Sequence, residues 1–149
     1  MAIKPINIEN LSLRQELYRR YWEMFNRLSF EHSEFSLNFK THPIASIRCY
    51  QDYSVGKPYR IVLKINFDTS VISVGIYFRD LVVYDEFYNK KDRIEQDVNC
   101  EIDWSRYITK GSAYIHKSID FSVDYGWELV CNCMIENAIL IKKTFEKYL

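Results

Sequence analysis

Glycine is scarce in this chain, and its scarcity excludes the common phosphate-binding loops. Only four glycines occur among 149 residues, and they stand far apart at Gly56, Gly75, Gly111 and Gly126. The GxGxxG and GxxxxGK[ST] patterns need clustered glycines so that backbone amides can approach a phosphate. The sequence therefore offers no candidate for nucleotide-loop chemistry.

A surplus of either charge is also absent. Twenty Lys and Arg residues balance twenty Asp and Glu residues. Proteins that coat nucleic acid usually carry a basic excess, so the balance argues against that class but leaves room for a local basic patch. No apolar run approaches the roughly 20 residues that span a bilayer, so we expect no membrane contact. Residues 1–5 lack the features of a signal peptide, which favours a cytoplasmic location.

The cysteines lack any metal-binding spacing. Cys49, Cys100, Cys131 and Cys133 form no CxxC motif and no Cys/His ligand pattern. Cys131 and Cys133 are two residues apart in a predicted helix, so their side chains diverge by about 200°. We interpret all four as buried structural thiols and predict no metal site and no cofactor.

The central element of the chain is a predicted β-hairpin from Tyr59 to Arg79. In its first strand Tyr59, Ile61, Leu63, Ile65 and Phe67 alternate with more polar residues, and in its second strand Ile72, Val74, Ile76 and Phe78 share one face. This alternation is typical of a sheet with one buried face. The short segment between them, residues 68–70, is the predicted turn.

The other predicted elements give an α+β fold of order α-β-β-β-α-β-β-α. The first helix is predicted over 13–28, after a capping box at Ser12 and Gln15. The second is predicted from Asp80 or Asp85 to about residue 98. The third is predicted from about residue 125 to the end, with Asp124 as its cap. Further strands are predicted over 44–53, 100–104 and 112–121, and residues 29–43 as a loop, with or without one helical turn. The simplest arrangement is a single mixed or antiparallel sheet of about five strands covered by three main helices. We expect one domain over residues 1–149, with a short leader at 1–11.

This order also resembles the layout of restriction-endonuclease-like nucleases. Those enzymes hold Mg²⁺ through an acidic residue on one hairpin strand and a Glu-x-Lys or Asp-x-Lys on the next, because hard cations prefer carboxylate oxygens. Here the second strand, Val71 to Tyr77, carries no carboxylate or lysine, and Asp68 stands alone in the turn. We therefore predict no catalytic residue and no metal ligand.

Four polar residues are candidates for a functional or structural role. Glu95 lies beside the apolar stripe of the second predicted helix, where it could accept hydrogen bonds from Arg106, Tyr107 or free amides of the next loop. A buried brace is the favoured interpretation of this carboxylate. His32 and His116 belong to no catalytic motif, and solvated or packed imidazoles are the expectation for both.

Several short motifs follow one another in a recognisable order. They are Tyr21–Phe25, Gly75–Phe78, Ile94 with Glu95, Ile102–Trp104, Gly111–Ile115, and Asp124 with Trp127. In this order they resemble the bacterial domain-of-unknown-function family numbered 4268, over about residues 12–149. Members commonly form the C-terminal part of longer proteins, some with a nuclease-like domain in front. The resemblance thus implies an accessory role near bacterial restriction or defence systems, with no known catalytic residues.

Two functions follow from these observations. The first is a non-catalytic protein-interaction module, which twelve tyrosines, balanced charge and the lack of a catalytic motif favour. The alternative is a nucleic-acid-associated or degenerate nuclease-like module, which the element order, the resemblance and the scattered Lys and Arg residues favour. A hydrolase that uses His32 or His116 is the least favoured, and a homodimer fits the aromatic content.

Overall fold

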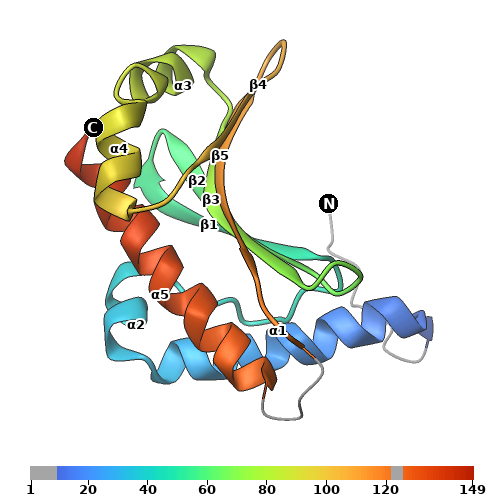
Figure 1. The fold of residues 1–149 in the computed structure, drawn as a ribbon. Helices are drawn as coiled ribbons and strands as arrows, with labels where there is room; N and C mark the ends of the chain where they lie inside the picture. Colours follow the sequence, from blue (N-terminus) through green and yellow to red (C-terminus); the bar gives the residue numbers. More distant parts are fainter. Residues whose placement is uncertain (1–9, 122–125) are drawn as a thin grey trace, which may run out of the picture.

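The fold is α+β, with one five-stranded sheet. The computed structural model describes residues 10–121 and 126–149 (Figure 1). The helices are α1 (Leu13–Glu31), α2 (Ser33–Asn38), α3 (Leu81–Tyr88), α4 (Lys91–Val98) and α5 (Gly126–Lys147). The strands are β1 (Tyr50–Lys57), β2 (Tyr59–Asn66), β3 (Val71–Phe78), β4 (Asp103–Arg106) and β5 (Gly111–Ser118). The sheet order is β1-β2-β3-β5-β4 and every neighbouring pair is antiparallel, so the predicted single sheet is confirmed in its antiparallel form.

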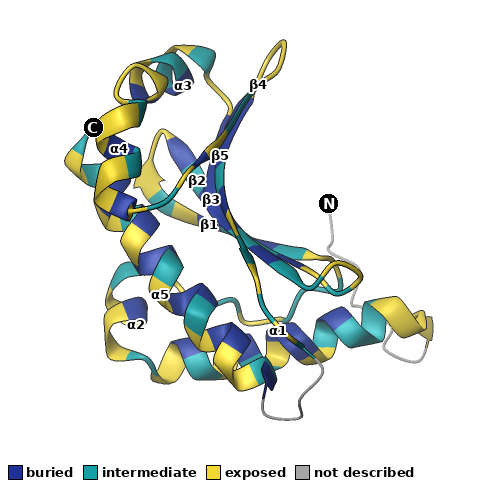
Figure 2. Cartoon of the chain, in the orientation of Figure 1, coloured by how far each residue is buried: buried dark blue, intermediate teal, exposed yellow. Residues whose placement is uncertain are grey.

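The helices cover one side of the sheet. α5 packs across β2 and β3, α1, α2 and α4 pack against α5, and α3 contacts β3, β4 and β5. Figure 1 shows the strands curving away from α5, so that the described helices lie on the convex side and none of them covers the concave side. Buried residues gather where α5 meets the sheet (Figure 2). In the described parts of the chain, no helix combines the length and hydrophobicity needed to cross a bilayer.

The predicted alternation in the hairpin is confirmed by burial. Ile61, Leu63 and Ile65 of β2 are buried, and so are Ile72, Val74, Ile76 and Phe78 of β3. They meet apolar residues of α5, which include Val130, Met134, Ile135, Ala138, Ile141 and Phe145. Full burial of each large aliphatic or aromatic side chain contributes about 1.5–3 kcal/mol, so this interface is the main source of stability.

The first helix is fixed at its start and at its centre. The predicted capping box is present, because the Ser12 hydroxyl accepts from the Gln15 amide while the Gln15 side chain accepts from the Ser12 amide. Trp22 is fully buried and its indole Nε1 donates to the Arg48 carbonyl at 2.8 Å. α1 continues to Glu31, three residues beyond the prediction, and the predicted loop 29–43 contains α2.

The strand predicted over 44–53 is wrong in its position. β1 begins at Tyr50, because amides of the preceding segment bond to side chains instead of a neighbouring strand. The Ser46 amide donates to Gln51 Oε1 at 3.2 Å, and the Arg48 amide donates to Ser46 Oγ at 3.0 Å. These local bonds replace ladder hydrogen bonds, as short polar side chains often do.

The second predicted helix is two helices. Asp80 is the N-cap of α3, since its Oδ1 accepts from the Val82 amide at 2.8 Å, which settles the choice between Asp80 and Asp85. A tight turn follows, in which the amides of Asn89 and Lys90 both donate to the Phe87 carbonyl, and α4 starts after it. β4 and β5 lie at 103–106 and 111–118 instead of 100–104 and 112–121. Asp124 and most of the leader 1–11 lie outside the described residues.

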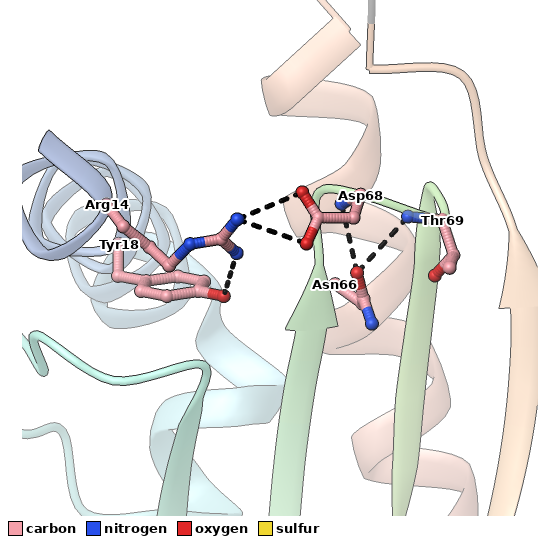
Figure 3. A network of polar contacts seen from close by, with 5 residues as sticks. All are labelled: Arg14, Tyr18, Asn66, Asp68 and Thr69. Carbon is pink, nitrogen blue, oxygen red and sulfur yellow. Dashed lines mark hydrogen bonds and ion pairs between the residues drawn. The ribbon is translucent and has the colours of Figure 1, made fainter.

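An ion pair joins α1 to the β2–β3 turn (Figure 3). The Arg14 Nη2 atom lies 3.1 Å from both carboxylate oxygens of Asp68, and Nη1 donates to the Tyr18 hydroxyl at 3.4 Å. Asn66 Oδ1 accepts from the amides of Asp68 and Thr69 and closes the turn. The lone turn carboxylate is therefore the partner of a guanidinium.

Loss of the hydroxyl group should change the stability of the protein in opposite directions at two buried tyrosines. Tyr59 Oη is buried with no hydrogen-bond partner among the described residues, whereas Tyr53 Oη accepts from Gln51 Nε2 at 3.0 Å. We expect Tyr59→Phe to leave the free energy of unfolding unchanged or raise it by about 1 kcal/mol, and Tyr53→Phe to lower it by about 1 kcal/mol. Urea denaturation measures both, and an equal loss in the two variants would contradict this packing.

Candidate functional site

The uncovered side of the sheet, which we call the concave face, is built from three rows of side chains. Directly paired residues of antiparallel strands point to the same side, so strand register fixes each row. From β1 towards β4 the rows are Tyr50, Lys64, Ser73 and His116; then Asp52, Val62, Gly75, Tyr114 and Asp103; then Ser54, Arg60, Tyr77, Ser112 and Ser105. The face is therefore polar and aromatic, opposite to the apolar face under α5.

The concave face holds a shallow hollow of about 890 Å³. Four tyrosines line it, namely Tyr50, Tyr77, Tyr107 and Tyr114. Gly75 stands in the middle row of the face, where a Cβ atom would lie 2.1 Å from the Ala113 carbonyl oxygen and 2.6 Å from Tyr114 Cδ1. The missing side chain thus lets the Tyr114 ring lie directly over β3, in agreement with the room that a strand glycine provides.

Cations outnumber acids around the hollow. Its lining includes Arg60, Lys64, Arg79 and Lys110, against Asp52 and Asp103. Both acids already have partners: Asp52 pairs with Arg60 at 3.0 Å, and Asp103 accepts from His116 at 3.0 Å. Lys64, Arg79 and Lys110 make no ion pair within residues 10–121 and 126–149, although Lys64 Nζ lies 4.4 Å from the centre of the Tyr114 ring.

A Ser-His-Asp chain crosses this face. Ser73 Oγ lies 2.7 Å from His116 Nδ1, and His116 Nε2 lies 3.0 Å from Asp103 Oδ2. A carboxylate only accepts, so Nε2 carries a proton, and in the neutral ring Nδ1 then accepts from the serine hydroxyl. The three residues thus have the order of nucleophile, base and orienting acid.

The residues around Ser73 do not supply the remaining groups that an acyl-transfer site needs. Such a site needs hydrogen-bond donors aimed at the developing oxyanion, most often free backbone amides. β3 pairs with β2 on one side and β5 on the other, so its amides are used in the two ladders. The chain of Ser73, His116 and Asp103 is best explained as a network that orients the imidazole.

The four residues singled out in the sequence lie in different places. Glu95 Oε1 accepts from the Ile102 amide and from Trp104 Nε1, both at 3.1 Å, so it links α4 to β4. Arg106 pairs with Asp85 at 3.1 Å and not with Glu95. His32 caps α2, with Nδ1 accepting from the Phe35 amide at 3.2 Å.

Only His116 belongs to the concave face, although Glu95 and His116 border one shallow groove beside β4. The other residues of the concave face were not predicted as a site. In the sequence they are the positions that alternate with the buried residues along each strand, which places Lys64, Tyr77 and Tyr114 on the side opposite the core. Among the described residues, no three His, Cys, Asp or Glu side chains are grouped in a way that could hold a metal ion.

The comparisons with known proteins identify the family and nothing finer. A family model described as a domain of unknown function, DUF4268, matches residues 17–149. The chain belongs to this family, as the order of its motifs predicts. No curated protein and no solved structure matches the chain.

The different exposure of the cysteines predicts that Cys49, at the edge of the concave face, is alkylated selectively. The prediction of a buried thiol is wrong for Cys49, which is exposed and lines the hollow. Cys131 is buried, and burial raises the pKa of its thiol to about 12. Burial also raises the pKa of Cys100 and Cys133. Because alkylation proceeds through the thiolate, iodoacetamide at pH 8 should modify Cys49 first and Cys131 only after unfolding. Peptide mass spectrometry with a Cys49→Ser control measures the order, and equal rates at Cys49 and Cys131 would contradict the packing of α5.

Proposed function

We propose that this domain is a non-catalytic binding module that takes single-stranded nucleic acid on its concave face. The carrying observation is the combination of four tyrosines with cations that have no acidic partner, on an uncovered sheet. Proteins that bind single strands combine a positive surface for the phosphates with aromatic rings on which bases stack. In a duplex the base faces are hidden, so tyrosines on an open sheet favour unpaired bases.

The zero net charge of the whole chain is compatible with this proposal, because the residues that line the hollow carry more positive than negative charges. The lining of the hollow has four cations against two acids, whereas some charges outside it pair with one another, as in Arg106 with Asp85 and Lys147 with Asp97. The three cations without an acidic partner give a modest electrostatic contribution. Affinity should therefore depend on salt, but less steeply than that of a strongly basic protein.

A protein partner is the second candidate function, and the tip of the β4–β5 hairpin, which meets the hollow at Tyr107, supports it. The β4–β5 hairpin projects beyond the sheet (Figure 1). At its tip Ile108 is 94% exposed and Tyr107 is 53% exposed, and exposed apolar groups of this kind suit a protein interface. A link to bacterial restriction or defence systems, a cytoplasmic location, a homodimer and a restriction-endonuclease-like layout remain predictions that follow from the sequence.

Fluorescence anisotropy with a labelled oligo(dT) of about 12 nucleotides tests the proposed function. Each neutralised phosphate of a single strand contributes about −0.7 to the slope of log affinity against log salt, so three cations predict a slope of about −2. Lys64→Ala should weaken binding and make the slope shallower by about 0.7. A duplex of the same length should bind more weakly.

Arg93→Ala is the matched control, because Arg93 is an exposed cation on α4 in the helical layer. It removes the same charge without touching the concave face and should bind like the unmodified protein. Absence of binding at 50 mM salt, or an equal loss in the Arg93 and Lys64 variants, would refute the nucleic-acid proposal.

A further inference from the structure

Two nearly parallel rings are neighbours on the concave face. Tyr114 and His116 are two residues apart on β5, so their side chains emerge on the same side of the strand. Their ring centres are 6.2 Å apart and their planes differ by only 24°. Tyr114 is paired with Gly75 of β3 and Asp103 of β4, and His116 is paired with Ser73 of β3, so strand pairing fixes the backbone that carries both rings.

The imidazole is held by a neighbour on each side. Ser73 stands directly opposite on β3, and Asp103 reaches the ring diagonally from β4. These two bonds fix the rotation of the ring and occupy both of its nitrogens. His116 is therefore left with its ring face to offer a ligand and has no nitrogen available for the edge of a base.

The position of the Tyr114 ring is also fixed by its neighbours. The ring lies over Gly75, where any larger residue would displace it, and the Lys64 ammonium lies 4.4 Å from its centre. Burial raises the pKa of the Tyr114 hydroxyl to about 12, so the ring is uncharged throughout the physiological range. An incoming base can take the place of the ammonium over the ring, because the cation–π contact at a partly exposed site is weak and the lysine can then contact a phosphate.

We infer that Tyr114 and His116 form a two-base stacking platform, on which two successive bases of a single strand are bound by their faces. Ser73 and Asp103 are positioning residues that hold the imidazole in place. Because both nitrogens of His116 are occupied within the protein, the platform binds bases without reading their edges, and recognition at this point tolerates any sequence. This inference rests on the proposed function and specifies how the same face binds its ligand.

Substitutions of the histidine separate stacking from hydrogen bonding. In the oligo(dT) titration, His116→Ala and Tyr114→Ala should each weaken binding about 5- to 100-fold, the usual loss for one stacked base. His116→Phe keeps a ring without nitrogens and should bind within about threefold of the unmodified protein. Oligo(dA), oligo(dT) and oligo(dC) of equal length should bind within about tenfold of one another. Thermal melting confirms that each variant is folded.

A double-mutant comparison tests the positioning role. Ser73→Ala should weaken binding in the unmodified protein, but it should have no effect in the His116→Phe background, where no imidazole is left to hold. If the protein binds with the predicted salt slope and His116→Ala has no effect, or His116→Phe fails to restore binding, the platform is refuted while the proposed function stands. If the unmodified protein binds no single strand, the proposed function itself fails, and with it this inference.

Discussion

Burial of one face of the sheet against α5 is the constraint on which the rest of the structure depends. A strand alternates its side chains between two faces, so packing one face under a helical layer assigns every second residue to the other side. Ile61, Leu63 and Ile65 face α5, and consequently Arg60 and Lys64 face outward. The composition of the concave face is therefore determined by the register that builds the core.

Much of the fold could be predicted from local patterns. The hairpin, the capping box at Ser12 and the single sheet follow from strand alternation and helix chemistry, which neighbouring residues determine. The errors occurred where side-chain hydrogen bonds, and not the alternation of apolar residues, decide the backbone structure. β1 starts at Tyr50 because side chains of Ser46 and Gln51 bond to the preceding amides, and nothing in the periodicity of residues 44–53 reports those bonds.

The candidate site was predicted less well, for a physical reason. Glu95 was recognised as a brace for free amides, and it does accept from the Ile102 amide. The residues that meet His116 come from two other strands, and their approach depends on β3 and β4 lying on opposite sides of β5. In the sequence Ser73, Asp103 and His116 are far apart and belong to no common motif. Their contact could not be predicted, because long-range packing sets the order of strands in the sheet.

The central claim is that the concave face, and not the helical layer, binds the ligand. Photocrosslinking to an oligo(dT) that carries 5-bromodeoxyuridine, followed by peptide mass spectrometry, locates the contact directly. We expect crosslinks on the peptides of β3 and β5, at Tyr77 and Tyr114, which line the hollow. Crosslinks confined to α1, α4 or α5 would contradict it.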